Sequence, residues 1–584
     1  MPTPSRAPDQ RDPSDSPGIR PIAMPGPPGI RPVPAMPTPR RPDPGECSPV
    51  LAPADGDRAN RPIARPGDWL LHAHERGNPD TDIDRRHADG AAWTSGNEVT
   101  PLVHGRAYFA ALRKAVRATR AGDLVLFTDW RGDPDEAVDD DGTAVSTLLC
   151  HAADRGVTVK GLVWRSHLDV LRFSSEENRR LGAEIEAAGG ECLLDMRVRP
   201  GGSHHQKMVV VRYRRRPDND VAFIGGIDLC HSRRDDERHH GDPRNQPMPP
   251  VYGDRPPWHD IQLAVRGPAV GDLEATFRER WGDPSALSHN PLRLATSWLD
   301  HDDLRADPLP AQAEDPGAHG TQLVQVLRTY PYRHWSYPFA RAGERSIARA
   351  YLKAVGRARS MIYLEDQYLW SAEVAQIFAE ALRRSPRLRM IAVIPLHPDT
   401  DGSTARAESL GRARALRLLR DAGGDRVAVY GIENHAGRPV YVHAKVCVID
   451  DTWTCVGSDN LNLRSWTHDS ELSCAVLDAD GGTSFGRALR LRLAREHLDL
   501  GDSDGDGDGD LVDPHAMFDA YRRSATALDA WHERPSAAPR PPGRLRTYQL
   551  PHLGLAPRLL ATPMYRYLCD PDGRPPTMRR RHLF

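Results

Sequence analysis

The chain has 584 residues, of which 39% are apolar and 27% charged, as in ordinary globular proteins. Its 78 basic and 80 acidic side chains leave a formal net charge of −2, which excludes a strong overall attraction to nucleic acid or to an anionic membrane. No run approaches the roughly 20 apolar residues of a membrane-spanning helix, and the start lacks the apolar segment of a secretory signal. The eight cysteines are scattered, as in a reducing compartment. We therefore expect a cytoplasmic protein whose contact with a membrane is peripheral.

Residues 1–67 are rich in Pro, Arg, Asp and Gly, which predicts a disordered tail because such a segment buries too little apolar surface to offset the entropy lost on ordering. Beyond Trp69, segments with helical apolar spacing alternate with short apolar runs, the pattern of an α/β fold. The expected order is a helix at 105–122, a strand at 123–130, a helix at 143–155, a strand at 157–164, a helix at 175–189 and a strand at 208–211.

The same order recurs later, with helices at 345–358, 373–384 and 404–422 and strands at 361–368, 388–395 and 445–450. Landmark residues keep a nearly constant offset, since Asp366 follows Asp129 by 237 positions and His443 follows His205 by 238. This agreement predicts two homologous α/β halves packed as one body, rather than the four domains that the length alone allows. We expect a first half at 68–290, a linker at 291–325, a second half at 326–500, and an acidic loop with a C-terminal extension at 501–584.

The acidic loop, GDSDGDGDGDLVD, places carboxylates near the ligand positions of a calcium-binding helix–loop–helix motif. The candidate ligands are Asp502, Asp504, Asp506, Asp508 and Asp513, with Gly507 at the turn. The fit is incomplete, because Gly509 stands where an apolar residue is usual and the last ligand is Asp instead of Glu. The alternative, which we favour, is a solvated acidic loop.

Each half contains a histidine and a lysine separated by one residue at the start of an apolar strand. These are His205 and Lys207 in HHQKMVVV, and His443 and Lys445 in YVHAKVCVID. Residues two apart in a strand point to the same face, so each His and its Lys project together. A single such pair is common and carries no functional meaning. Two copies at matching places in a repeat predict that both pairs serve one active site.

A glycine-containing corner and a strand headed by an acid follow the His-x-Lys pair in each half. The corners are IGGID, with Gly226 and Asp228, and VGSDN, with Ser458 and Asn460. The strands are DIQLAV, headed by Asp260, and ELSCAV, headed by Glu471.

Together these residue types predict phosphoryl transfer that requires no metal or other cofactor. A neutral imidazole is a nucleophile near pH 7, and a second, protonated imidazole can donate its proton to the departing alkoxide, typically worth about 10² to 10⁴ in rate. The two lysines can stabilise the phosphate oxygens, and Ser458 and Asn460 can add hydrogen-bond donors. Asp260 and Glu471 can each accept a hydrogen bond from the far nitrogen of a histidine and fix its orientation. The residues alone leave open which histidine is the nucleophile.

This set of residues resembles the phospholipase D superfamily, whose mark is a duplicated HKD motif. The second copy is complete, with His443, Lys445 and Asp450 followed by GSDNLNLRS. The first half is particularly similar to phospholipases D of the eukaryotic type, through HHQK, FIGGIDLC and PWHDIQLAV. The resemblance, over about residues 100–500, implies two halves with pseudo-twofold symmetry, each a mixed β-sheet flanked by helices. It also implies a covalent phosphohistidine, with His205 as nucleophile and His443 as acid and then base.

The first motif departs from this pattern. Arg212 occupies the place of the motif aspartate, and an apparent insertion, RYRRRPDND, follows, in which Asp218 or Asp220 could substitute. Gly226 and Asp228 stand where the motif has serine and asparagine, as in the eukaryotic-type enzymes. Because the missing aspartate lies beyond the strand and is not a reacting group, we expect catalysis to survive.

The resemblance to lipid-cleaving members favours hydrolysis of a glycerophospholipid to phosphatidic acid, or transfer of its phosphatidyl group to another alcohol. Four aromatic residues near the motif strands either belong to the core or line an acyl or headgroup pocket. They are Trp164, Trp258, Tyr368 and Trp370, of which we select Trp258 and Tyr368 as substrate-binding candidates. Basic residues at 212–216 and 578–584 either contact anionic headgroups or are solvated surface. We expect a monomer that meets phospholipid at a membrane surface.

Two other functions compete with this interpretation. A nuclease or other phosphodiesterase would share the motif, but the neutral charge and the lack of a long basic stripe weaken that hypothesis. A lipid-binding scaffold with weak catalysis would explain the altered first motif and the Pro-rich tail, but all four His-x-Lys residues are present.

Overall fold

The two repeats fold into matching series of strands and helices in the computed structural model, which describes residues 65–87, 90–166, 175–288, 305–479, 485–501, 509–534, 539–551 and 554–584. The first series is β1 (Thr94–Val103), α3 (Gly105–Arg117), β2 (Leu124–Asp129), α4 (Val145–Asp154), β3 (Thr158–Trp164), α5 (Ser175–Ala187), β4 (Glu191–Asp195), β5 (Met208–Arg212), β6 (Val221–Gly225), β8 (Ile261–Arg266) and α6 (Ala269–Trp281). The second series is β9 (Gln322–Tyr330), α8 (Ser346–Val355), β11 (Met361–Asp366), α9 (Ala372–Arg384), β12 (Arg389–Val393), α10 (Gly402–Gly423), β13 (Val427–Ile432), β15 (Lys445–Ile449), β16 (Trp453–Gly457), β17 (Glu471–Asp478) and α11 (Phe485–His497). The α/β class and the repeat are confirmed.

All of these strands lie in one sheet whose order is nearly palindromic. From one edge to the other it runs β13-β12-β11-β15-β16-β17-β9-β1-β8-β6-β5-β2-β3-β4, with β18 (Leu545–Thr547) added beside β13. Counted outward from the antiparallel β9–β1 pair, the strands of the two halves follow the same order, from β17 and β8 beside the pair to β13 and β4. A pseudo-twofold axis therefore passes between β9 and β1, as the resemblance implies, and residues 62–584 form one compact unit.

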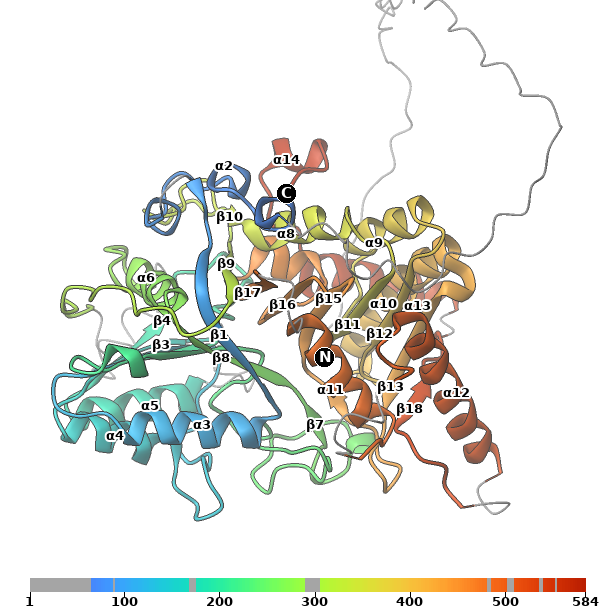
Figure 1. Cartoon of the computed structure of the whole chain (residues 1–584), viewed down its shortest axis with the longest axis horizontal. Helices are drawn as coiled ribbons and strands as arrows, with labels where there is room; N and C mark the ends of the chain where they lie inside the picture. Colours follow the sequence, from blue (N-terminus) through green and yellow to red (C-terminus); the bar gives the residue numbers. More distant parts are fainter. Residues whose placement is uncertain are drawn as a thin grey trace, which may run out of the picture. The chain divides into compact units, whose positions relative to one another are not determined.

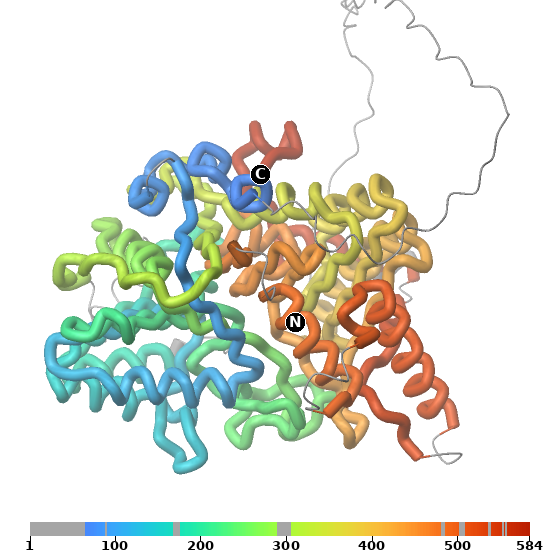
Figure 2. The backbone as a smooth tube through the Cα atoms, viewed as in Figure 1, coloured from blue at the N-terminus to red at the C-terminus, as the bar shows by residue number. Residues whose placement is uncertain are grey.

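Helices cover the outer face of each half of the sheet (Figure 1). In the first half, α3, α4 and α5 lie side by side and pack on β2, β3 and β5 through residues such as Phe109, Leu149 and Phe127. In the second half, α8, α9 and α10 pack on the equivalent strands of that half, through residues such as Phe378 and Leu416. The blue-to-green and yellow-to-orange parts of the chain in Figure 2 are these two layered halves.

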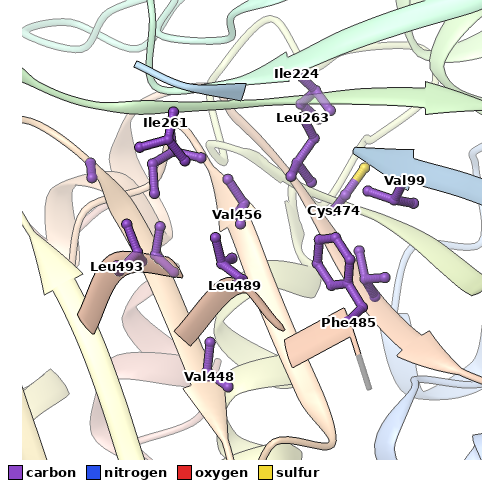
Figure 3. Close-up of a cluster of buried hydrophobic side chains, with 14 of the residues drawn as sticks. Val99, Ile224, Ile261, Leu263, Val448, Val456, Cys474, Phe485, Leu489 and Leu493 are labelled. Carbon is purple, nitrogen blue, oxygen red and sulfur yellow. The ribbon is translucent and has the colours of Figure 1, made fainter. Parts of the chain in front are cut away.

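The opposite face of the sheet shares one core between the halves (Figure 3). In this view Phe485, Leu489 and Leu493 of α11 approach Val448, Val456 and Cys474 of the second half, and Val99, Ile224, Ile261 and Leu263 of the first half belong to the same cluster. Because these side chains are buried together, separating the halves would expose a large apolar surface, so the two halves are held as one body by the hydrophobic effect.

Some boundaries differ from the expected ones. The expected helix at 105–122 ends at Arg117, and β11 ends at Asp366 because its carboxylate accepts the N–H groups of Tyr368 and Leu369 and turns the chain. Strand β9 begins at Gln322, inside the span expected to be a linker.

Further elements before, between and after the two series complete this body. These are α1 (Pro66–Trp69), α2 (Ala73–Arg76), β10 (Glu344–Arg345), α12 (Pro514–Glu533), α13 (Leu555–Met564) and α14 (Pro576–Arg580). Asp513, a candidate calcium ligand, caps α12 by accepting the N–H groups of His515 and Ala516, whereas Asp502, Asp504 and Asp506 lie outside the described residues. Across the described ranges, no helix has both the length and the apolar character needed to cross a bilayer.

Candidate active site

The two histidines of the repeated motif are brought together by backbone pairing that crosses from one half to the other. His204 forms a parallel bridge with Ser470, and β14 (Tyr441–Val442) pairs in parallel with β7 (Trp258–His259). The next residue after the first pairing is His205 on one chain segment and Glu471 on the other. The next residue after the second pairing is His443 on one segment and Asp260 on the other. Each motif histidine is therefore set opposite the acid of the other half.

The crossed pairing makes two histidine–carboxylate hydrogen bonds. Nδ1 of His205 lies 2.8 Å from Oε2 of Glu471, and Nδ1 of His443 lies 2.6 Å from Oδ2 of Asp260. Both carboxylates are fully buried, and the side chains of His205 and His443 are 16% and 6% exposed. Since a carboxylate only accepts, each Nδ1 carries the proton, and each Nε2 is left as the nitrogen that can react.

The two lysines lie beside these histidines. Nζ of Lys207 is 3.1 Å from the carbonyl of His205 and 3.2 Å from Oδ1 of Asp228. Nζ of Lys445 donates to the carbonyl of His443 and, at 3.1 Å, to Oε1 of Gln367. Both ammonium groups are buried, and burial lowers the pKa of Lys445 to about 8. The site thus concentrates positive charge where an anionic phosphodiester would sit.

Electrostatic effects act across the boundary between the two halves. Burial, then Lys207, then Lys445 lower the pKa of His205 well below its usual range, so a lysine of the second half acts on a histidine of the first. Burial and Lys445, with smaller effects from Arg233 and Lys207, do the same to the pKa of His443. Both imidazoles are therefore neutral at pH 7 before substrate binds.

The glycine corners set the position of the acids. A Cβ on Gly226 would lie 2.2 Å from Oδ1 of Asp260, so only glycine leaves room for that carboxylate. At the equivalent place in the second half, the hydroxyl of Ser458 donates to Oε2 of Glu471 at 2.5 Å and accepts the N–H of Leu472 at 3.0 Å.

Asp228 and Asn460, the two remaining corner candidates, are both buried at the base of the site. Asp228 pairs with Lys207, whose charge holds its pKa below the usual value although burial alone would raise it. Burial and Asp228 in turn raise the pKa of Asp129, so Asp129 holds a proton that Asp228 shares. Oδ1 of Asn460 has no hydrogen-bond partner among the described residues, which leaves it available to a bound ligand.

The aromatic candidates occupy different surroundings. The Trp258 ring lies 5.1 Å from the His443 ring and carries the Arg233 guanidinium at 4.1 Å over its face. Tyr368 stacks on Trp370 at 3.8 Å, in an apolar cluster that also contains Tyr565.

Arg212, in the place of the motif aspartate, forms buried ion pairs with Asp220 at 2.7 Å and Glu274 at 2.5 Å. It is therefore not available to lipid headgroups. Asp450, the intact motif aspartate of the second half, accepts N–H groups of Arg359, Ser360 and Met361 at 2.8–2.9 Å. This position braces the start of a strand, and its contacts are with backbone rather than with the reacting groups.

Three residues near the site were missed from the sequence. Arg233 covers Trp258, Gln367 binds Lys445, and the ring of Trp130 lies 6.3 Å from that of His205. Gln367 and Trp130 each follow a strand that ends in one of the equivalent residues Asp129 and Asp366, so the repeat itself could have pointed to them. Arg233 lies in a long segment without periodicity, and no comparable signal was present.

Comparisons with known proteins agree with this geometry. The family profile described as "Phospholipase D" matches residues 131–382, and the one described as "Cardiolipin synthase, PLD-like domain" matches residues 351–484. The chain is 24% identical to phospholipase D alpha 2 of Oryza sativa subsp. japonica, over 65% of this chain and 62% of the relative, and 26% identical to phospholipase D2 of Bos taurus, over 71% and 55%. The chain thus spans little more than half the length of these two relatives.

Among solved structures, a phosphatidylserine synthase of Haemophilus influenzae Rd KW20 matches at 13% identity with a TM-score of 0.47, covering 69% of this chain and 88% of that one. With both halves matched by profiles of this family and the duplicated motif placed as described, the chain belongs to the phospholipase D superfamily.

Proposed function

We propose that the protein is a phosphodiesterase that cleaves glycerophospholipids on the headgroup side of the phosphate, through a covalent phosphohistidine on His205. The observation that carries the proposal is the crossed pair of hydrogen bonds, His205 with Glu471 and His443 with Asp260, around two buried lysines. The arrangement offers a nucleophile, a proton donor and an electrostatic cradle for one phosphorus atom.

In the first step, Nε2 of His205 attacks phosphorus and the bond to the headgroup oxygen breaks. Nε2 of His443 supplies the proton to that oxygen, and the charge of the bound phosphodiester opposes the lowering of its pKa by the lysines. In the second step, His443 takes a proton from water or an alcohol, whose oxygen attacks phosphorus while the N–P bond breaks. Water gives phosphatidic acid, and an alcohol gives a new phosphatidyl ester.

A surface cavity supports a lipid substrate. A cavity of about 1050 Å³ is lined by six arginines together with Tyr332, Tyr567 and His468. Tyr567 is 83% exposed, and Leu560, on the preceding helix α13, is 81% exposed. His468 lies three residues before Glu471 in the chain. Exposed apolar side chains beside arginines match the interfacial region of an anionic membrane.

The test is to incubate the purified full chain with phosphatidylcholine vesicles and ethanol, and in parallel with single- and double-stranded DNA. We expect phosphatidylethanol and phosphatidic acid from the wild type, and at least a 1,000-fold loss in His205→Ala and in His443→Ala, since nucleophile and acid act as a unit. Cleavage of DNA but not of phospholipid would identify the protein as a nuclease. Binding of vesicles without turnover would make it a scaffold, and either result would refute the proposal.

A further inference from the structure

Behind the active site lies a buried group of histidines and glutamates to which the reaction above assigns no step. It contains His104, His239, His259, His497, Glu365 and Glu496, and the four histidines are at most 1% exposed. The rings of His104 and His259 are 4.8 Å apart, and those of His239 and His259 are 5.7 Å apart. So many ionisable groups in one buried place need either protons or a cation to balance them.

Hydrogen bonds fix which nitrogens carry protons. Nε2 of His259 lies 2.6 Å from a carboxylate oxygen of Glu365, and Nδ1 of His239 lies 3.0 Å from the carbonyl oxygen of Trp258. Both partners only accept, so both nitrogens donate. In neutral rings, Nδ1 of His259 and Nε2 of His239 therefore carry lone pairs.

These two lone pairs point at the same carboxylate oxygen. Oε1 of Glu496 is 3.0 Å from Nε2 of His239 and 3.4 Å from Nδ1 of His259, and the latter has no hydrogen-bond partner among the described residues. The other oxygen, Oε2, faces Nε2 of His104 at 2.9 Å. With both rings neutral, three acceptors thus converge on one point, and a proton or a metal cation between them is needed to hold them together.

We propose that Nε2 of His239, Nδ1 of His259 and Oε1 of Glu496 bind one divalent transition-metal ion, with Zn²⁺ as the best match. Zinc bonds of about 2.0–2.2 Å in a tetrahedron place neighbouring ligand atoms about 3.3–3.6 Å apart, close to the separations present here. Two imidazoles and a carboxylate suit zinc better than calcium or magnesium, which prefer oxygen ligands.

The surroundings of the three ligands match those of known metal sites. Ligating histidines usually donate their other N–H to a carboxylate or a carbonyl, as His259 does to Glu365 and His239 does to Trp258. His104 supports the remaining ligand by contacting the second oxygen of Glu496.

The ion would join the two halves rather than react with substrate. His239 and His259 come from the first half and Glu496 from α11 of the second. His259 directly precedes Asp260, and its carbonyl accepts the N–H of His443 at 2.8 Å. A bound ion would therefore fix the backbone that carries one histidine–carboxylate pair of the active site.

Glu496 also lines a cavity of about 940 Å³, which gives an ion a path to solvent. Four arginines line the same cavity, Arg492, Arg495, Arg540 and Arg544. Their charge opposes passage of a free cation, so we expect the ion to be bound during folding and released slowly to a chelator.

The test uses untagged full-length protein produced with Zn²⁺ in the medium. We expect about one zinc per chain by elemental analysis after dialysis. Glu496→Gln and His239→Gln are expected to lower zinc affinity at least about 10-fold, whereas His435→Ala, which removes an exposed histidine on the same cavity, retains the metal.

A second measurement covers the case in which the variants do not fold. Wild-type protein produced with Co²⁺ in place of Zn²⁺ is expected to show the visible absorption of tetrahedral cobalt, and prolonged chelation is expected to lower its melting temperature. Wild-type protein without bound metal, and with a melting temperature unchanged by added Zn²⁺, would overturn the proposal. Metal content is read independently of turnover, so this result and the failure of the phosphodiesterase proposal are distinguishable.

Discussion

Replacing Gly226 by alanine tests whether the acid of the first half positions the histidine of the second. The new Cβ would lie 2.2 Å from Oδ1 of Asp260, and ordinary contacts begin at 3.4 Å, so the carboxylate must move by about 1.2 Å. That carboxylate is held by Nδ1 of His443 at 2.6 Å and by the N–H of Ile261 at 2.8 Å. A shift of this size cannot keep both hydrogen bonds at their present lengths.

A misplacement of about 1 Å near a reacting group costs on the order of 100-fold in rate, or about 2.7 kcal/mol of transition-state stabilisation. We therefore expect Gly226→Ala to lower kcat about 100-fold in the hydrolysis of phosphatidylcholine, whose alkoxide leaving group needs the proton that His443 donates. KM should change little, because the interaction lost is one that orients the proton donor.

Two further variants make this result specific. Gly317→Ala adds a Cβ that meets nothing within 4 Å and should be neutral. In an Asp260→Gly background, adding Gly226→Ala should cost almost nothing more, since the group that it displaces is gone. A kcat of Gly226→Ala within threefold of the wild type, at equal melting temperature, would refute the reasoning.

Three other predictions follow from the site and its surroundings. Because burial and two lysines lower the pKa of His205, its imidazole stays neutral as the pH falls, and the acid limb of kcat/KM should have its midpoint below about 6.5; a midpoint above that value would contradict the shift. Arg212→Met leaves Asp220 and Glu274 without their buried partner and should cost about 3–5 kcal/mol in chemical unfolding with kcat nearly unchanged, whereas Arg215→Met at an exposed position should cost nothing measurable. Tyr368→Phe should leave KM within twofold because the stacking on Trp370 is kept, whereas Trp258→Ala should raise KM several-fold by removing a ring that contacts His443.

Several inner strands of each half could be predicted because they are buried and contain apolar runs, as in MVVV of β5 and MIYL of β11. The two strands at the pseudo-twofold axis could not. β9 carries Gln325 and Arg328, which are fully buried; Gln325 bonds the backbone of Leu71, and Arg328 pairs with Glu344. Polar residues that are satisfied by distant partners break the apolar pattern, so no strand was predicted here and the first residues of β9 fell within the expected linker.

Site residues could be predicted where the same pattern occurs in both halves of the sequence. They could not be predicted where the contact joins residues that are far apart in the chain. The His-x-Lys pairs and the acids that head two strands stand out because they occur twice. Which acid serves which histidine is decided by the crossed backbone pairing of His204 with Ser470 and of Val442 with His259, and no spacing in the chain encodes it. The convergence of His239 and Glu496, 257 residues apart, is hidden for the same reason.

The two halves differ where their chemistry must differ. Oε2 of Glu471 accepts both Nδ1 of His205 and the hydroxyl of Ser458, whereas Oδ2 of Asp260 serves His443, with glycine in the place of that serine. A carboxylate oxygen shared with a second donor stabilises an imidazolium less, so the asymmetry favours His205 as the group that stays neutral and attacks, and His443 as the group that carries a proton.

Ser458→Ala tests this asymmetry, because it returns the full acceptor strength of Glu471 to His205. A hydrogen bond to a charged group is worth about 1.5–3 kcal/mol, so an upward shift of about one to two units is expected in the acid limb of kcat/KM. The N–H of Leu472 also loses its acceptor, which should cost about 1–3 kcal/mol in stability. Ser403→Ala, at an exposed position of α10, controls for the substitution itself. If the acid limb of Ser458→Ala coincides with that of the wild type, the serine does not distinguish the two histidines, and their roles must be set by the incoming substrate.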